Sequence, residues 1–110
     1  MNILNKIKQI IGEILDLEEQ DVTAESYLVR ELGAESIDLL ELAAALQTAF
    51  RIEVNAADLF LQGARTNLLP AEAPFLTGAR LAEIAADLAA GPVIKVKDLV
   101  SYVEWKLEGQ

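Results

Sequence analysis

The chain has 110 residues, of which 53% are hydrophobic, and its formal net charge is −9. This length and composition suit one compact core, so we expect residues 1–110 to form a single domain. Cysteine and histidine are both absent, which excludes disulfides, thiolate metal sites, a cysteine nucleophile, the usual general base and the usual zinc ligand. We therefore expect neither catalytic residues nor a metal site.

The acidic residues are concentrated in the first half of the chain. Residues 11–41 contain ten carboxylates and a single base, Arg30. Such a field repels nucleic acid and anionic lipid and attracts basic protein surfaces, although the same charge can serve only to keep a small apolar domain in solution. Because no run of 18 uncharged apolar residues occurs, we expect a cytoplasmic protein that does not insert into membranes.

Two long helices are predicted in the first half. Apolar residues recur every three or four positions over residues 3–17, which indicates a helix with one buried face. The same periodicity returns over residues 36–50, where alanine and leucine also favour helix. Between them, residues 18–35 are predicted to be a long ordered loop that bends at Gly33. Its apolar anchors are Val22, Tyr27, Leu28, Val29 and Leu32.

The segments after residue 50 are shorter. Residues 52–54 are predicted to be an extended linker, and Asn55 to cap a short helix that runs through Asp58 and Leu61. Residues 62–75 contain glycine and proline breakers and are predicted to be a loop.

Two more helices are predicted near the C-terminus. Thr77 is expected to cap a helix that Gly91 and Pro92 terminate, with an apolar stripe formed by Leu81, Ile84, Ala85 and Leu88. The last helix is predicted over residues 97–108, anchored by Tyr102 and by a partly exposed Trp105. The total is four to five helices.

Ser36 lies where the second long helix should begin. Serine can accept a hydrogen bond from the unpaired amides of a first helical turn, and Gly33 just upstream lets the chain bend. In most proteins a serine in this position is only a helix cap.

The eleven residues from Leu32 to Leu42, LGAESIDLLEL, resemble the attachment motif of acyl carrier proteins. In that family an Asp-Ser-Leu triplet opens the second helix of a four-helix bundle, and here the triplet reads Glu35-Ser36-Ile37. Residues 50–54 and 95–100 are similar to the family's sequence after that helix and at the start of its last helix. The resemblance covers roughly residues 1–60 and 93–108.

This resemblance implies an all-α, acyl-carrier-like four-helix bundle with a long first loop. It implies a monomeric carrier, not an enzyme, that holds acyl intermediates as thioesters for fatty acid, lipid or polyketide biosynthesis. Their tether would be 4'-phosphopantetheine, supplied by coenzyme A and attached covalently to Ser36. The implied partners are a phosphopantetheinyl transferase (holo-ACP synthase), acyl-ACP synthetases or acyltransferases, and ketosynthase-type enzymes with basic surfaces.

Five residues around Ser36 are candidates for partner binding. Glu35, Asp38 and Glu41 recur every three residues and are expected to line one exposed flank of the helix. The resemblance favours their recognition by basic enzymes, and the alternative is a solvated face that complements the helix dipole. Ile37 and Leu40, together with Ala44, form an apolar stripe. This stripe either contacts a partner or lines the mouth of an acyl-chain pocket, or it belongs to a broad core face. Leu39, Leu42, Leu46 and Phe50 are predicted to be core residues.

Residues 61–92 form an insert that is longer than the corresponding part of a usual acyl carrier. It is predicted to add one helix and to pack on the bundle through Leu68, Leu69, Phe75, Leu76, Leu81, Ile84 and Leu88. We therefore expect a specialised carrier. The insert would enlarge an acyl cavity, dock a dedicated enzyme, or simply extend the structure.

Three other functions compete with that of an acyl carrier. A peptidyl or aminoacyl carrier of a non-ribosomal pathway uses the same arm on the same kind of serine. A helical interaction module would leave Ser36 unmodified. An independent enzyme is the weakest alternative, because a serine nucleophile needs a positioned base and there is no histidine to provide it.

Overall fold

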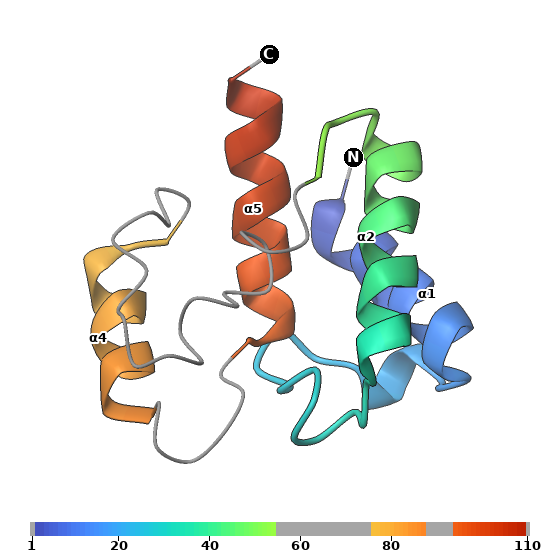
Figure 1. Cartoon of the computed structure of the whole chain (residues 1–110), viewed down its shortest axis with the longest axis horizontal. Coiled ribbons are helices and arrows are strands. Elements are labelled where there is room, and N and C mark those ends of the chain that lie inside the picture. The colour runs from blue at the N-terminus through green and yellow to red at the C-terminus, as the bar shows by residue number, and fades with distance from the viewer. Residues whose placement is uncertain (1, 55–75, 88–93, 110) are drawn as a thin grey trace.

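The structure is a computed structural model that describes residues 2–54, 76–87 and 94–109 (Figure 1). Its elements, in chain order, are α1 (Ile3–Leu15), the short 3₁₀ helix η1 (Glu19–Asp21), α2 (Ser36–Phe50), α4 (Gly78–Asp87) and α5 (Val96–Glu108). Extended pairing in these ranges is limited to one isolated bridge, between Tyr27 and Lys95. The predicted all-α bundle is confirmed, and both long helices of the first half start at the predicted residues.

Helix α1 ends two residues earlier than its hydrophobic periodicity predicts. Asn2 caps the helix start by accepting the Asn5 N–H at 3.1 Å. At the other end Asp16 adopts a left-handed backbone with a φ of 57°, and the Leu17 N–H bonds to the Gly12 carbonyl at 2.9 Å. A Cβ on Gly12 would lie 2.8 Å from the Leu17 carbonyl oxygen, so the chain can fold back only over a glycine.

Helix α1 packs against both α2 and α5, and the three helices enclose the main core (Figure 1). The α2 residues predicted to be core, Leu39, Leu42, Leu46 and Phe50, are all buried. Helix α1 contributes Ile7 and Ile11, and α5 contributes Leu99, Tyr102 and Val103. The core is therefore built from the predicted faces of the predicted helices.

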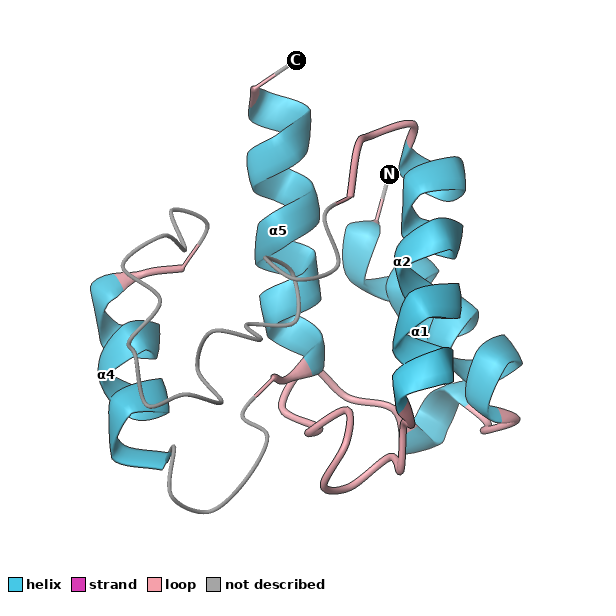
Figure 2. Cartoon of the chain, viewed as in Figure 1, coloured by secondary structure: helices cyan, strands magenta, loops and turns pink. Residues whose placement is uncertain are grey.

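The long loop between α1 and α2, whose irregular course is seen in Figure 2, is ordered by apolar anchors and by backbone pairing. Val22 and Leu28 are fully buried, and the other predicted anchors, Tyr27, Val29 and Leu32, are half-buried. Segment 24–28 runs beside segment 94–97, which leads into α5. The Leu28 N–H bonds to the Ile94 carbonyl, the Val96 N–H to Ser26 and the Lys97 N–H to Ala24, at 2.9–3.1 Å.

Helix α4 is the described part of the insert, and it lies on the side of α5 opposite α1 and α2 (Figure 1). Thr77 caps it as predicted, because its Oγ1 accepts the Arg80 N–H at 3.1 Å. Ile84 and Leu76 are buried, and Leu81 packs against the core while half-buried. The described part of the insert therefore packs on the bundle as expected.

The start of α5 is built around a buried carboxylate. Asp98 is only 1% exposed, and its oxygens accept the Lys95 N–H at 2.9 Å and the Nε and Nη2 of Arg80 at 2.8 and 2.7 Å. The hydrogen bonds that Arg80 donates to Asp98 raise the pKa of Arg80 above its ordinary value. A two-pronged ion pair thus joins α4 to α5 at Asp98. Asp98 is the third residue of α5, which starts at Val96, one residue before the predicted start.

The predicted helix after Asn55, the predicted loop over 62–75 and the predicted stop at Gly91 and Pro92 lie outside the described residues. So do Leu68, Leu69, Phe75 and Leu88 of the insert. Within the described ranges, no helix has the length and apolar character needed to cross a membrane.

Candidate functional site

The loop before α2 closes into a tight turn that delivers the chain to Ser36. The Leu32 N–H bonds to the Tyr27 carbonyl, the Gly33 N–H to Val29 and the Ala34 N–H to Leu28, at 3.0–3.2 Å. Gly33 has a φ of 75°, which L side chains rarely adopt, so this bend favours a glycine and any other residue would be strained there. Because Leu28 is fully buried, the turn is anchored to the core.

Helix α2 begins at Ser36, and its N-cap position is Glu35. The Asp38 Oδ2 accepts the Glu35 N–H at 2.9 Å, and the Glu35 carbonyl accepts the first helical bond, from the Leu39 N–H, at 3.0 Å. The interpretation of Ser36 as the N-cap is therefore wrong by one residue. An acid three residues after the N-cap residue bonds back to the N-cap N–H, as in a capping box.

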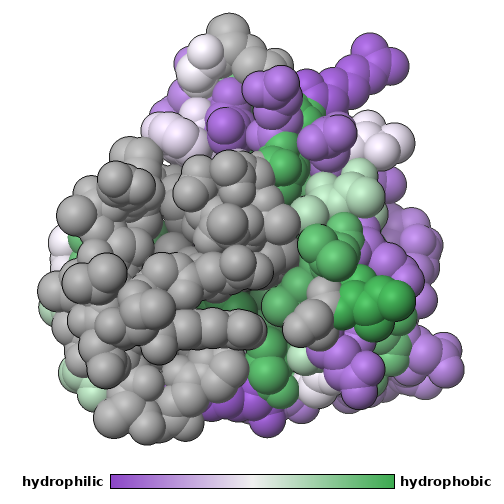
Figure 3. Space-filling model, viewed as in Figure 1, coloured by the Kyte–Doolittle hydropathy of each residue, from purple (hydrophilic) through white to green (hydrophobic). Residues whose placement is uncertain are grey.

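The apolar stripe on α2 faces solvent. Ile37 and Leu40 are each 62% exposed, and Ala44 is exposed as well. Figure 3 shows apolar side chains gathered over α2 next to hydrophilic ones. Assigning this stripe to a broad core face is therefore wrong, and the stripe is available to a partner.

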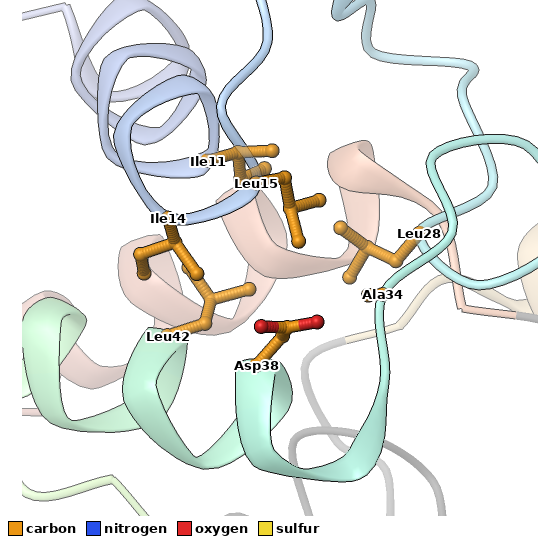
Figure 4. A pocket seen from close by; sticks show the side chains of 7 residues that line it. All are labelled: Ile11, Ile14, Leu15, Leu28, Ala34, Asp38 and Leu42. Carbon is orange, nitrogen blue, oxygen red and sulfur yellow. The ribbon is translucent and has the colours of Figure 1, made fainter.

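The three acids of the predicted flank do not share one environment. Glu35 and Glu41 are exposed, whereas Asp38 is only half-exposed. The carboxylate of Asp38 is directed toward a small void between α1, α2 and the loop (Figure 4). Its position is explained by the bond to the Glu35 N–H. The expectation that all three acids line one exposed flank is thus wrong for Asp38, which is only half-exposed and whose carboxylate accepts the Glu35 N–H at the helix start.

The void beside Asp38 has a volume of about 10 Å³, which is about the space of one water molecule. Its lining is otherwise apolar and comes from Ile11, Ile14, Leu15, Leu28, Ala34 and Leu42. In this conformation the void cannot hold an acyl chain.

The aromatic anchors of α5 lie away from the start of α2. Tyr102 is 1% exposed and Trp105 is 38% exposed, as predicted, and their ring centroids are 5.9 Å apart. They belong to the second half of α5, which ends at the opposite end of the bundle from the start of α2 (Figure 1). Across the described ranges no group of acids is arranged to hold a metal ion.

Sequence comparison assigns the chain to a family. The family model described as the phosphopantetheine attachment site matches residues 5–66. An acyl carrier protein of Thermotoga maritima is 42% identical over 57 residues, which are 52% of this chain and 70% of that protein. An acyl carrier protein of Buchnera aphidicola is 49% identical over 53 residues, which are 48% of this chain and 68% of that protein.

The chain belongs to the acyl carrier protein family, whose domain is a phosphopantetheine-attachment domain. It is therefore a carrier protein, and membership implies a covalently attached 4'-phosphopantetheine. The helical bundle agrees with this assignment.

The bond between Asp38 and Glu35 predicts which residue stabilises the start of α2. Replacing Asp38 with alanine should lower the free energy of unfolding by about 1 kcal/mol, because a charge-assisted bond to the N-cap amide is lost. Ser36→Ala should change it by less than about 0.5 kcal/mol, since Ser36 does not occupy the N-cap position. Urea unfolding of the unmodified chain measures both. If Ser36→Ala is as destabilising as Asp38→Ala, the capping role assigned to Asp38 is incorrect.

Proposed function

We propose that Ser36 is the residue that bears the 4'-phosphopantetheine arm, and that the chain carries acyl groups as thioesters on this arm. The observation that carries the proposal is the position of Ser36 as the first residue of α2. The resemblance of Glu35-Ser36-Ile37 to the family's attachment triplet supports the same residue. The family match over residues 5–66 includes it.

The surroundings of Ser36 fit such a group. Glu35 is exposed, and Ile37 and Leu40 are each 62% exposed, so the neighbouring side chains leave room for an arm and for the enzyme that adds it. The amides of a first helical turn and the positive end of the helix dipole favour a phosphodiester. When attached, the arm supplies the thiol that holds the acyl group as a thioester.

Partner recognition is proposed to use the exposed residues of α2. Glu35 and Glu41 offer negative charge, and Ile37 and Leu40 offer apolar area between them. Basic surfaces of a phosphopantetheinyl transferase, of acyl-ACP synthetases or acyltransferases, and of ketosynthase-type enzymes would complement this mixture. Asp38 is proposed to contribute indirectly, by fixing the helix start.

The cargo is proposed to be an acyl intermediate of fatty acid, lipid or polyketide biosynthesis, carried by a specialised, monomeric, cytoplasmic protein with no catalytic activity of its own. The specialisation is inferred from helix α4, which the insert adds beside α5.

Attachment at Ser36 can be tested by incubating the purified chain with coenzyme A and a broad-specificity phosphopantetheinyl transferase. Intact mass spectrometry should reveal a gain of one phosphopantetheine per chain. Ser36→Ala, which keeps the helix, should gain nothing. If several transferases add no group to the natural chain, the protein is a helical interaction module instead. Loading the arm with fatty acyl or aminoacyl donors then separates an acyl carrier from a peptidyl carrier.

Charge reversal tests the partner surface. Glu41→Lys should lower kcat/KM for loading by roughly 3- to 30-fold at low salt, because it places a positive charge opposite a basic enzyme surface. The loss should shrink as ionic strength rises. Glu104→Lys, an equal change at an exposed position of α5, is the matched control. Equal losses in the two variants would contradict a docking surface on α2.

A further inference from the structure

The ion pair between Arg80 and Asp98 joins the insert to the bundle. It lies beside segment 94–97, which is paired with the loop before α2. Arg80 lies in α4 and Asp98 near the start of α5, and their side chains are 8% and 1% exposed. The guanidinium contacts the carboxylate with two nitrogens, Nε and Nη2. Such a pair is directional, and removing one partner leaves the other buried and uncompensated.

The carboxylate of Asp98 also binds the backbone at the start of α5. Its Oδ2 accepts both the Arg80 Nη2 at 2.7 Å and the Lys95 N–H at 2.9 Å. Segment 94–97 is therefore held by the same oxygen that holds Arg80. A shift of the carboxylate would move the Lys95 amide with it.

Segment 94–97 in turn holds the loop that leads to Ser36. It pairs with segment 24–28 through the bonds of Ile94, Val96 and Lys97. Glu25 adds ion pairs to Lys95 at 3.2 Å and Lys97 at 3.0 Å, and these bonds lower the pKa of Glu25. Three backbone hydrogen bonds and two ion pairs thus hold the two segments together.

The last links run from Leu28 to the start of α2. The Leu28 carbonyl accepts the Ala34 N–H at 3.0 Å, and the next residue, Glu35, is the N-cap whose N–H is bound by Asp38 at 2.9 Å. Leu28, Ala34 and Asp38 also line the same void (Figure 4). An unbroken series of hydrogen bonds and covalent links therefore connects Arg80 in α4 with the residue that precedes Ser36.

We propose that Arg80 is a positioning residue for the attachment site, acting through Asp98 and the paired segments 94–97 and 24–28 on the start of α2. The insert is then coupled to the loading of Ser36 although its helix lies on the other side of α5 (Figure 1). A partner that binds α4 and shifts Arg80 would then also alter the rate of loading at Ser36. The loading part of this inference rests on the function proposed above.

The coupling is tested by backbone amide shifts in NMR spectra of the full chain. Arg80→Met removes the guanidinium and keeps an unbranched side chain, and it should shift the amides of Leu28, Ala34 and Glu35 as well as those of segment 94–97. Glu83→Gln is the matched control. It lies one turn further along α4, is exposed, and contacts Lys97 only at 3.9 Å. It should leave the amides of Leu28, Ala34 and Glu35 unchanged.

Loading kinetics give the second readout. Arg80→Met should lower kcat/KM for transfer to Ser36 by roughly 2- to 30-fold under conditions where the variant is folded. Asp98→Asn keeps an acceptor for the Lys95 N–H, and the double variant with Arg80→Met no longer buries an unpaired charge. The loss of kcat/KM in the double variant should therefore be smaller than the product of the losses in the two single variants. Arg80→Lys, which keeps the charge but loses the two-pronged geometry, serves if Arg80→Met does not fold.

The outcomes separate the two proposals. If the natural chain is not loaded at Ser36, the proposed function fails, while the NMR test of coupling still stands. If the natural chain is loaded, and the Arg80 variants load at the natural rate with amide shifts confined to residues near 76–100, the coupling is overturned. A loss of thermal stability alone, without those shifts, would also overturn the coupling, because the ion pair would then only stabilise the fold.

Discussion

The buried carboxylate of Asp98 is the point on which several segments of this small bundle depend. Burying a carboxylate is costly unless donors replace the lost water, and here the donors come from two different segments, Arg80 of α4 and the backbone of Lys95. The segment around Lys95 then pairs with segment 24–28 of the first loop. An insert helix, the last helix and the loop before α2 are thereby gathered at one end of the molecule.

Neighbouring residues at the start of α2 have different structural roles. Glu35 and Asp38 form the cap of the helix, and Leu39 and Leu42 fill the core. Ile37 and Leu40 remain exposed, although exposing large apolar side chains is unfavourable for an isolated domain. The helix is thus stabilised without Ser36 in the N-cap position and without Ile37 or Leu40 in the core, which leaves these residues exposed for the partner surface proposed above.

Much of this could be predicted from the sequence, because local signals were sufficient. Periodicity predicted α1, α2 and α5 and the core face of α2, and Thr77 predicted the start of α4. The exposure of Ile37 and Leu40 could not be predicted, because α2 is apolar on more than one face and only the packing of α1 decides which face is buried. The Arg80–Asp98 pair joins residues 18 positions apart, which no local pattern indicates. The predicted N-cap, Ser36, is one residue after the observed N-cap, Glu35. The sequence did not distinguish them, because the two residues are adjacent and both side chains can accept a hydrogen bond.

The central claim, that Ser36 carries the arm, is tested most directly on protein purified from its own cells. Trypsin should release residues 31–51, which contain only two hydroxyl side chains, Ser36 and Thr48. Fragmentation of this peptide in a mass spectrometer should locate one phosphopantetheine on Ser36, with Thr48 unmodified. A peptide that is entirely unmodified in cells whose other carriers are loaded, or an arm found on another residue, would contradict the account.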